Sequence, residues 1–484
     1  MKKLVLGTGR SGLAVSRYLL ECGESIIVSD QRDRVSVEAS TLWPQFEELV
    51  ARYGVQLEWS LGGHPLELLE SCDEVVISPG ISLHIEFLQQ ALARGVRVSG
   101  EMELAYQAST KPLIAVTGTN GKSTTCSVLG EMFGPKGIVG GNIGTPLLDQ
   151  VQGLDSQVDW VVAEVSSFQL ETVHGYRPRI GILTNISPDH LDHHKDLEEY
   201  RVAKSRLFAQ MDSNCVAIFC EDDPVAVQIA NELSSSRLPN WMGSFPAPRN
   251  SDAPKILGYS SKKSVEHGVA ITSDEQGEKW VTRFTSGVPE KLFVWDFSGL
   301  PGGAMMSNGL AATAAALEAG LSLKEIQDGL RRFQPLRYRM ELAGTLNGID
   351  FINDSKATNI DSALASARAV EGPLAVIVGG KDKGVDYRGL AEGLSQRDGR
   401  VFLIGEAAQP IATSLRDIGF LNLQQSGTME KAIEEARRFL EPDGGTVLLA
   451  PACSSFDQFK SAEQRGEIFN RIVDELKKTG SNRG

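Results

Sequence analysis

The chain has 484 residues, 41% of them hydrophobic and 23% charged, and a formal net charge of −14. This length allows three domains that each bury a core, and the acidic balance argues against a nucleic-acid or anionic-membrane surface. The chain contains no run of about 18 apolar residues, the length of a membrane span. We therefore expect a cytoplasmic protein that binds neither nucleic acid nor membrane. Separately, we expect a monomer.

The first expected domain, residues 1–109, alternates strands and helices: KKLVLG, a helix from Ser11, then SIIVSD and DEVVIS. Its turn Gly7–Gly12 reads G-x-G-x-x-G, and Asp30 ends the next strand. Such glycines let a pyrophosphate approach the backbone, and the acid can bind a ribose hydroxyl. The pattern fits NAD or the diphosphate of a UDP-sugar. The residues placed to contact this ligand are Arg10, Ser11, Asp30, Arg32 and Gly80.

The second expected domain, residues 110–334, contains three β-branched runs, LIAVT, DWVVAEV and IGILTNI, of the length of buried parallel strands. Helices are expected at Asn308–Ala319 and Leu323–Phe333. Residues 233–300 are polar and proline-rich at first and then alternate in short runs. We interpret them as loops and edge strands that cover this domain.

The sequence LIAVTGTNGKST at residues 113–124 predicts a phosphate loop. A strand that enters a glycine-rich turn directs successive backbone N–H groups to one point, and the next helix adds its positive end. Val116 occupies the position of the first glycine in the common eight-residue form, so this loop is a compact variant. Lys122 supplies a cation, and the Ser123 or Thr124 hydroxyl can ligate Mg²⁺. The residues expected to bind ATP are Gly118, Thr119, Asn120, Gly121, Lys122, Ser123 and Thr124.

Further metal ligands are expected downstream of this loop. Glu164 ends DWVVAEV and can reach a metal ion directly or through water. PDHLDHH at residues 188–194 holds three histidines, of which we choose His190 because it is nearest the strand end. We expect His193 and His194 to be mainly solvated.

The third expected domain, residues 335–484, has the strands IDFIND, PLAVIVGG, RVFLIG and TVLLAPA. The loops INDSKATN, VGGKDKGVDY and APACSSFDQFKSAEQRG follow strand ends, where open α/β sheets bind ligands. We expect this domain to close over the phosphate loop. The predicted fold is therefore α/β, with three Rossmann-like domains of which the central one binds ATP.

As a set, these motifs resemble the Mur ligase family over nearly the whole chain. The matching blocks are GTGRSG, SPGI, GTNGKST, GGNIG, EVSSFQLE, ISPDHLD, INDSKATN, GGKDKGVDY and PACSSFDQFK with EQRG. GTNGKST alone would also suit folylpolyglutamate synthases. PACSSFDQF together with GTGRSG implies the branch that adds D-glutamate to UDP-N-acetylmuramoyl-L-alanine in peptidoglycan synthesis. The implied chemistry is ATP-dependent: an acyl phosphate forms on the substrate carboxylate, and the D-glutamate amine attacks it.

The resemblance also implies roles for single residues. Ser123 or Thr124 and Glu164 would hold one Mg²⁺, and His190 would hold a second. Lys204 matches a lysine that is typically carbamylated and so becomes an anionic metal ligand. The remaining implied contacts are Asn308, Arg339 and Asp354 with the nucleotide, Asn142 with the muramoyl part or the reacting centre, and Lys356, Thr358, Lys383 and Ser455 with D-glutamate.

The chain departs from the family pattern at four positions. Ala304 and Met305 replace a frequent His-Asn pair, Tyr338 replaces a histidine and Ala462 a phenylalanine. We expect these changes to alter the adenine and D-glutamate contacts and to leave the reaction type intact.

Three other functions remain open from the sequence. An NAD-dependent oxidoreductase would explain GTGRSG and Asp30 but not GTNGKST. A sibling ligase would add another amino acid. A nucleotide-switched binding protein would keep the fold without catalysis.

Overall fold

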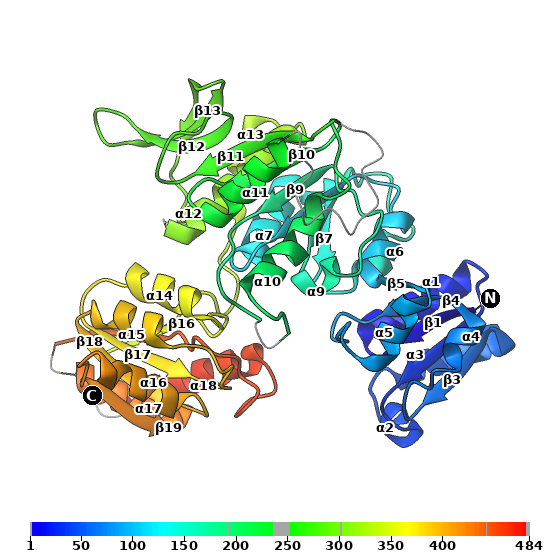
Figure 1. The fold of residues 1–484 in the computed structure, drawn as a ribbon. Helices are drawn as coiled ribbons and strands as arrows, with labels where there is room; N and C mark the ends of the chain where they lie inside the picture. Colours follow the sequence, from blue (N-terminus) through cyan, green and yellow to red (C-terminus); the bar gives the residue numbers. More distant parts are fainter. Residues whose placement is uncertain (1, 191–192, 236–251, 301–302, 442, 481–484) are drawn as a thin grey trace. The chain divides into compact units, whose positions relative to one another are not determined.

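The structure is a computed structural model that describes residues 2–190, 193–235, 252–300, 303–441 and 443–480. These residues form three β-sheets (Figure 1), which confirms the predicted three-domain α/β architecture. The chain divides into two compact units, Met1–Ile186 with Glu198–Phe333 and Ser187–Leu197 with Gln334–Gly484. The limits 1–109, 110–334 and 335–484 stay predictions. Among the described helices none is both long and apolar enough to span a membrane.

The first sheet is fully parallel and has the strand order β3-β2-β1-β4-β5, which is that of a Rossmann half. Its strands are β1 (Lys2–Leu6), β2 (Ile26–Asp30), β3 (Leu57–Leu61), β4 (Cys72–Ile77) and β5 (Arg97–Gly100). Its helices are α1 (Arg10–Glu21), α2 (Arg34–Glu38), α3 (Trp43–Tyr53), α4 (Leu68–Ser71), α5 (Glu86–Ala93) and α6 (Glu101–Ala108), with a 3₁₀ turn at Gly54–Gln56. Successive β1 residues face opposite ways: Val5 joins the apolar cluster of Leu13 on α1, and Leu4 joins that of Phe87 on α5. Both faces of the sheet are therefore covered.

The turn between β1 and α1 requires glycine at two positions. Gly7 has φ +97°, in the left-handed region. A Cβ on Gly12 would lie 1.9 Å from the Gly7 carbonyl oxygen. The first turn of α1 therefore lies directly against the end of β1.

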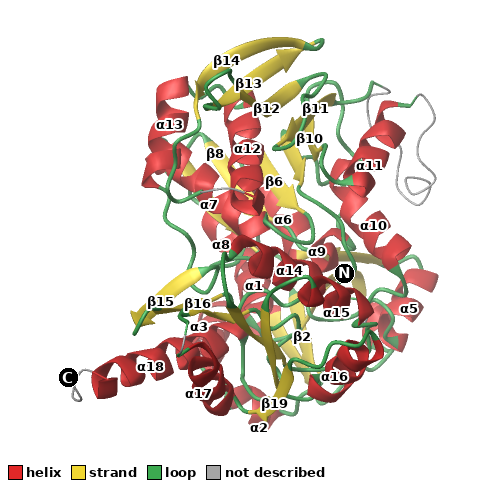
Figure 2. Ribbon diagram, turned by 90° about the vertical axis from the view of Figure 1, so that its left-hand side faces the viewer, coloured by secondary structure: helices red, strands yellow, loops and turns green. Residues whose placement is uncertain are grey.

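The central sheet has the order β14-β13-β12-β11-β10-β9-β6-β8-β7, parallel from β7 to β12 and antiparallel at β13 and β14. Its strands are β6 (Leu113–Thr117), β7 (Gly137–Gly141), β8 (Trp160–Glu164), β9 (Ile180–Leu183), β10 (Val216–Cys220), β11 (Lys255–Ser260), β12 (Gly268–Ser273), β13 (Lys279–Thr285) and β14 (Val288–Val294). Its helices are α7 (Lys122–Phe133), α8 (Leu147–Val151), α9 (Ser167–Leu170), α10 (Leu197–Ser205), α11 (Pro224–Ser234), α12 (Gly303–Glu318) and α13 (Leu323–Arg332), with 3₁₀ turns at Gly134–Lys136 and Arg206–Phe208. Helices α7, α12 and α13 pack together beside β6 and β8 (Figure 2).

The interpretation of residues 233–300 was partly wrong. Strands do occur there, but β11 and β12 lie inside the sheet, and of β11 to β14 only β14 is at an edge. Short alternating runs do not reveal such pairing, because they do not show which strands lie on either side of them: β11 pairs with both β10 and β12. Residues 236–251 lie outside the described residues.

One apolar cluster continues from the first sheet into the central one. It includes Val28 of β2, Met102 of α6, Leu148 of α8 and Ala163 of β8. An ion pair of 2.7 Å between Arg17 and Asp149 links α1 to α8. This shared core explains why the first two sheets form one compact unit.

The third sheet has the order β15-β16-β20-β17-β18-β19, with only β15 antiparallel to its neighbour. Its strands are β15 (Glu341–Leu346), β16 (Ile349–Asn353), β17 (Leu374–Gly379), β18 (Gly399–Ile404), β19 (Leu423–Gly427) and β20 (Gly445–Leu449). Its helices are α14 (Ile360–Ala369), α15 (Arg388–Ser395), α16 (Ala408–Asp417), α17 (Met429–Leu440) and α18 (Ala462–Gly480). Val376 packs in the cluster of α14 to α16, and its neighbour Ile377 packs in that of α17 and α18. The third sheet therefore has a core of its own on each face.

A buried carboxyl group at the start of α6 makes stability depend on pH. Glu101 accepts a hydrogen bond of 2.7 Å from the Leu148 N–H, and burial raises the pKa of Glu101 to about 7. The folded state then holds this proton more tightly than the unfolded state, so stability is lost as the pH rises from about 4.5 to about 7. We expect Glu101→Gln to melt several degrees above the wild type at pH 8 and at the same temperature at pH 5.

Scanning calorimetry between pH 5 and pH 8 measures this difference. Glu21→Gln, at an exposed position of α1, is the matched control and should leave the pH profile unchanged. A difference between Glu101→Gln and the wild type that does not vary with pH would contradict the assignment.

Candidate functional site

The glycine-rich turn after β6 has a backbone that other residues cannot adopt. Gly118 has φ +141° and Gly121 has φ +88°. A Cβ on Gly118 would lie 1.9 Å from Thr184 Oγ1. The turn ends at Lys122, the first residue of the twelve-residue helix α7. The N–H groups at this helix end point along the helix axis and favour an anion.

Two lysines meet at one oxygen of this turn. Lys122 Nζ donates to the Gly118 carbonyl oxygen at 2.7 Å and to that of Thr119 at 2.8 Å. Lys204 Nζ, from α10, donates to the same Gly118 oxygen at 2.8 Å and lies 4.5 Å from the centre of the Tyr200 ring. Lys204 is buried, with 1% of its surface exposed. Two ammonium groups this close repel each other, so the arrangement suits an anion between or beside them.

The turn is also fixed by the residues that follow β9. Asn185 Oδ1 accepts the Asn120 N–H at 2.9 Å, and Asn185 Nδ2 donates to the Asn120 carbonyl at 3.0 Å. The Asn185 carbonyl accepts the Thr119 N–H at 2.9 Å, and Thr184 Oγ1 donates to the Asn120 carbonyl at 2.6 Å. Neither Thr184 nor Asn185 is among the residues predicted from the sequence. Their position at the end of IGILTNI could have indicated this role, because β9 lies next to β6 and both strands end at the same edge of the sheet.

Glu164 lies beside the turn because β8 pairs with β6 in the register Val116↔Glu164. The Glu164 carboxylate is 2% exposed, and its Oε1 accepts a hydrogen bond of 2.9 Å from Asn142 Nδ2. Its Oε2 is buried without a hydrogen-bond partner among the described residues. A buried carboxylate oxygen of this kind fits Mg²⁺, which prefers hard oxygen ligands. Ser123 and Thr124 lie in the first turn of α7 and offer hydroxyl groups.

Asn308 lies on α12 against the same turn. A Cβ on Gly121 would be 2.2 Å from Asn308 Oδ1, and Asn308 is 7% exposed. Ala304 and Met305 stand in the first turn of α12. The unit that holds the first two sheets therefore brings together the turn, Lys122, Lys204, Glu164, Asn142 and Asn308.

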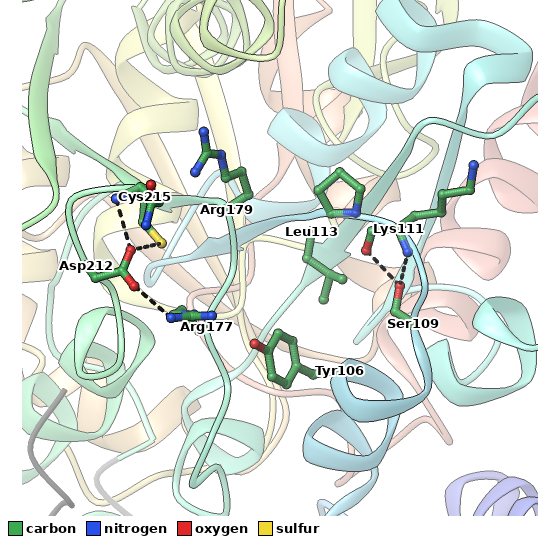
Figure 3. Close-up of a pocket in the computed structure, with 10 residues that line it drawn as sticks. Tyr106, Ser109, Lys111, Leu113, Arg177, Arg179, Asp212 and Cys215 are labelled. Carbon is green, nitrogen blue, oxygen red and sulfur yellow. Dashed lines mark hydrogen bonds and ion pairs between the residues drawn. The ribbon is translucent and has the colours of Figure 1, made fainter. Parts of the chain in front are cut away.

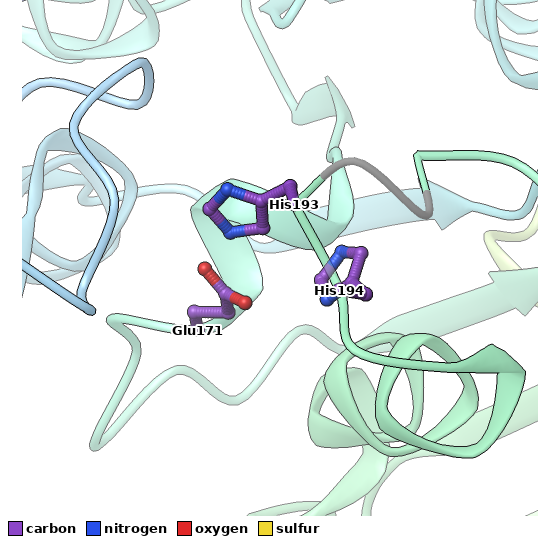
Figure 4. A group of neighbouring side chains, drawn as sticks. All are labelled: Glu171, His193 and His194. Atoms are coloured by element: carbon purple, nitrogen blue, oxygen red, sulfur yellow. The ribbon is translucent and has the colours of Figure 1, made fainter. Parts of the chain in front are cut away.

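The histidine segment belongs to the C-terminal unit, Ser187–Leu197 with Gln334–Gly484. His190 has φ +55°, its side chain is 43% exposed, and its Nε2 lies 3.8 Å from Asp189 Oδ2. His193 and His194 meet edge to face with 4.9 Å between ring centres (Figure 4). The expectation that both are solvated was wrong for His194, which is 1% exposed: its ring packs against His193, and its N–H donates to the His190 carbonyl. Glu171, also drawn in Figure 4, belongs to the other unit.

Asp189 holds several residues of the C-terminal unit together. It was not among the site residues predicted from the sequence. Its carboxylate accepts hydrogen bonds from Lys383 Nζ at 2.9 Å and from Asn359 Nδ2 at 3.1 Å. Burial opposes ionisation, but the charges of His190 and Lys383 and these hydrogen bonds lower the pKa of Asp189 to about 2. Lys383 also donates to the Thr358 carbonyl at 3.1 Å. Lys383 and Thr358, both predicted, are therefore neighbours.

The other predicted residues of this unit follow β16 and β20. Asp354 is buried, accepts a hydrogen bond from Ser366 Oγ and has a pKa raised by burial. Lys356 forms an ion pair with Glu463, and Ser455 is 2% exposed. Because β16, β20 and β17 are parallel neighbours, their following loops share one sheet edge. Arg339 precedes β15.

Arg465, within the EQRG motif, is a further residue for which the sequence predicted no role. Its guanidinium is fully buried and donates to Ser355 Oγ at 3.0 Å, the Ser355 carbonyl at 2.9 Å and the Cys453 carbonyl at 3.1 Å. It therefore connects the loops after β16 and β20.

The predicted ligand contacts of the first sheet also gather at one edge. Arg10 and Ser11 begin α1, and Gly80 follows β4. Asp30 accepts hydrogen bonds from Arg32 Nη2 at 2.8 Å and the Thr8 N–H at 2.9 Å. Burial opposes ionisation of Asp30, but hydrogen bonds from Arg32 and Thr8 hold its pKa well below the usual value. Asp30 and Arg32 thus pair with each other.

Comparisons with known proteins cover the whole chain. Residues 1–100 match the family model of the Mur ligase MurD-like N-terminal domain, residues 116–316 that of the Mur ligase middle domain, and residues 338–453 that of the Mur ligase glutamate ligase domain.

The chain is 38% identical over 480 residues to UDP-N-acetylmuramoylalanine–D-glutamate ligase of Pelotomaculum thermopropionicum, covering 99% of this chain and 98% of the relative. The ligase of the same name from Syntrophotalea carbinolica is 36% identical over 485 residues, with the same coverage.

Among solved structures, UDP-N-acetylmuramate-alanine ligase of Thermotoga maritima has a similar fold, with a TM-score of 0.53 at 17% identity over 99% of this chain and 100% of that chain. The three matched family models and the relative that is 38% identical show that the chain belongs to the Mur ligase family.

Proposed function

We propose that this protein is an ATP-dependent ligase that joins D-glutamate to UDP-N-acetylmuramoyl-L-alanine in peptidoglycan synthesis. One observation carries the chemistry: two lysines contact a glycine turn at the start of a helix, and the neighbouring strand ends in a buried carboxylate with an oxygen that has no hydrogen-bond partner among the described residues. The substrates follow from the curated relatives, which carry this ligase name and align with 99% of the chain. Membership of the family removes the NAD-dependent oxidoreductase alternative.

The reaction needs an activated carboxylate, because a free carboxylate does not condense with an amine in water. In the proposed mechanism the terminal phosphoryl group of ATP passes to the carboxylate of the muramoyl substrate, and the amine of D-glutamate displaces phosphate. The N–H groups of Thr119 and Asn120 are donated to Asn185, so the backbone N–H groups at the start of α7 are the ones assigned to the phosphates. The Lys122 ammonium offsets charge that builds up in transfer.

We assign the proposed Mg²⁺ to oxygen-rich positions. Glu164 supplies its unpartnered Oε2, and Ser123 or Thr124 supplies a hydroxyl. His190 stays our choice for a second ion. When bound, Mg²⁺ neutralises charge between the phosphates and the carboxylate. Carbamylation of Lys204 would replace the repulsion between two ammonium groups with an attraction to Lys122.

The remaining assignments concern substrate binding. Lys356 and Lys383 supply cations, and Thr358 and Ser455 hydroxyls, which suits the two carboxylates of D-glutamate. Arg339, Asp354 and Asn308 are assigned to the nucleotide. The edge of the first sheet with Arg10, Ser11, Asp30, Arg32 and Gly80 is assigned to the UDP part, and Asn142 to the muramoyl part.

Phosphate release tests the function directly. We expect release only when ATP, Mg²⁺, UDP-N-acetylmuramoyl-L-alanine and D-glutamate are all present, and its loss when any one is omitted. Lys122→Ala should lower turnover by about 10²-fold or more, because a group that stabilises transition-state charge is lost. Release that depends on another amino acid instead would identify a sibling ligase, and release without any amino acid would contradict the proposal.

Lys204 has a specific signature if it is carbamylated. Lys204→Ala should reduce turnover by about 10²-fold or more, with partial recovery on addition of acetate or another small carboxylic acid, which restores an anion. Lys204→Arg keeps the positive charge but does not form the carbamate, so it should be equally inactive. Steady-state rates measure both, and near-normal activity of Lys204→Arg would exclude the carbamate.

Asn185 is expected to act as a positioning residue for the phosphate loop. Asn185→Ala leaves the part-buried Asn120 N–H without its side-chain acceptor, a loss at the lower end of the range of about 1–3 kcal/mol. We expect a raised KM for ATP with a smaller change in KM for D-glutamate. Asn185→Asp keeps the acceptor and should be intermediate, and Asn231→Ala, exposed on α11, is the control. Equal changes in both KM values would contradict a local role.

A further inference from the structure

A hollow lies at the amino-terminal edge of the central sheet. Its volume is about 230 Å³, and its lining comes from α6 and from the segments that lead into β6, β9 and β10 (Figure 3). Strand β6 starts at this hollow with Leu113 and reaches the phosphate loop after Thr117. Five residues of strand span about 15 Å, so the hollow is separate from the proposed ATP site.

The charged residues of the hollow are mainly basic. Lys111, Arg177 and Arg179 line it together with one acid, Asp212. Asp212 is buried and pairs with Arg177, with 2.7 Å between Oδ2 and Nη1. The hollow thus has an excess of two positive charges in a protein whose net charge is −14. A local field of this sign attracts an anion.

Two of these cations have no partner in the described part of the chain. The side chains of Lys111 and Arg179 make no hydrogen bond or ion pair with any residue that the structure describes. Arg177, by contrast, is held in place by Asp212, whose other oxygen accepts the Asn214 N–H at 2.9 Å. One guanidinium is therefore fixed, and two further cations are available to an oxyanion.

The hollow also has an apolar wall. Tyr106 of α6 packs edge to face on Tyr176, with 5.4 Å between ring centres. In Figure 3 the Leu113 side chain extends toward the Tyr106 ring, and both residues line the hollow. A ring or short chain attached to the anionic group could pack against this wall.

We propose that this hollow is a binding site for a small organic oxyanion, a carboxylate or a phosphate monoester with an apolar body. Its volume is below the 300–1,000 Å³ or so of pockets for drug-sized ligands, which limits the occupant to a small molecule. The site goes beyond the proposed ligase function and shares none of the residues assigned to it.

Calorimetric titration with phenyl phosphate and with benzoate tests the site, and the two probes distinguish the phosphate from the carboxylate. The titrations use full-length Lys122→Ala, in which the phosphate loop is impaired. We expect saturable binding of at least one probe, weakened at least tenfold by Lys111→Ala with Arg179→Ala. The matched control is Arg94→Ala with Lys324→Ala, which removes two exposed positive charges elsewhere in the same unit and should change affinity less than twofold.

Three results would overturn the proposal: no binding of either probe, equal binding by the Lys111/Arg179 variant, or equal weakening by the control variant. Lys111 is partly exposed and Arg179 exposed, and neither has a protein partner among the described residues, so their removal leaves the core intact. The outcome is independent of phosphate release, so failure of this site and failure of the ligase function are distinguishable.

Discussion

The hydrogen bonds between Asn185 and the backbone of Asn120 hold the phosphate loop to the neighbouring strand, and the rest of the site depends on this attachment. Both residues sit at carboxyl ends of adjacent parallel strands, β9 and β6. The register of β8 adds Glu164 at the same level. Parallel strand pairing therefore brings the phosphate loop, the Asn185 amide and the Glu164 carboxylate together, although they are distant in the chain. Lys122 and Lys204 contact the same loop.

Much of the fold could be predicted because the signals were local. β-Branched runs such as LIAVT and LAVIVG became buried strands, and the loops after them fell at one edge of each sheet. The order of strands in the central sheet was not predictable in this way. Strand β11 lies between β10 and β12 inside the sheet, and no short run of residues encodes that choice.

The residues of the candidate site also fall into two groups: those that a local motif predicts and those that come together only in the folded chain. Lys122 directly follows the glycine turn in the sequence, so the local motif was sufficient to predict its place in the site. Lys204 contacts Gly118 across 86 positions of sequence, and only the family resemblance pointed to it. Asp189 and Lys383 are 194 positions apart, and their pairing, like the burial of His194, became visible only in three dimensions.

The apolar cluster shared by the first two sheets has a consequence for how the chain comes apart. A fragment that ended between α6 and β6 would expose the surfaces of Met102 and Leu148 to water, so neither half would be autonomous. The third sheet has a separate apolar core on each face and shares neither with the first two sheets. Proteolysis in the connection near Phe333 should release the third sheet as a folded piece that has lost only the Ser187–Leu197 segment and its Asp189 contacts. A fragment cut near Ser109 should unfold.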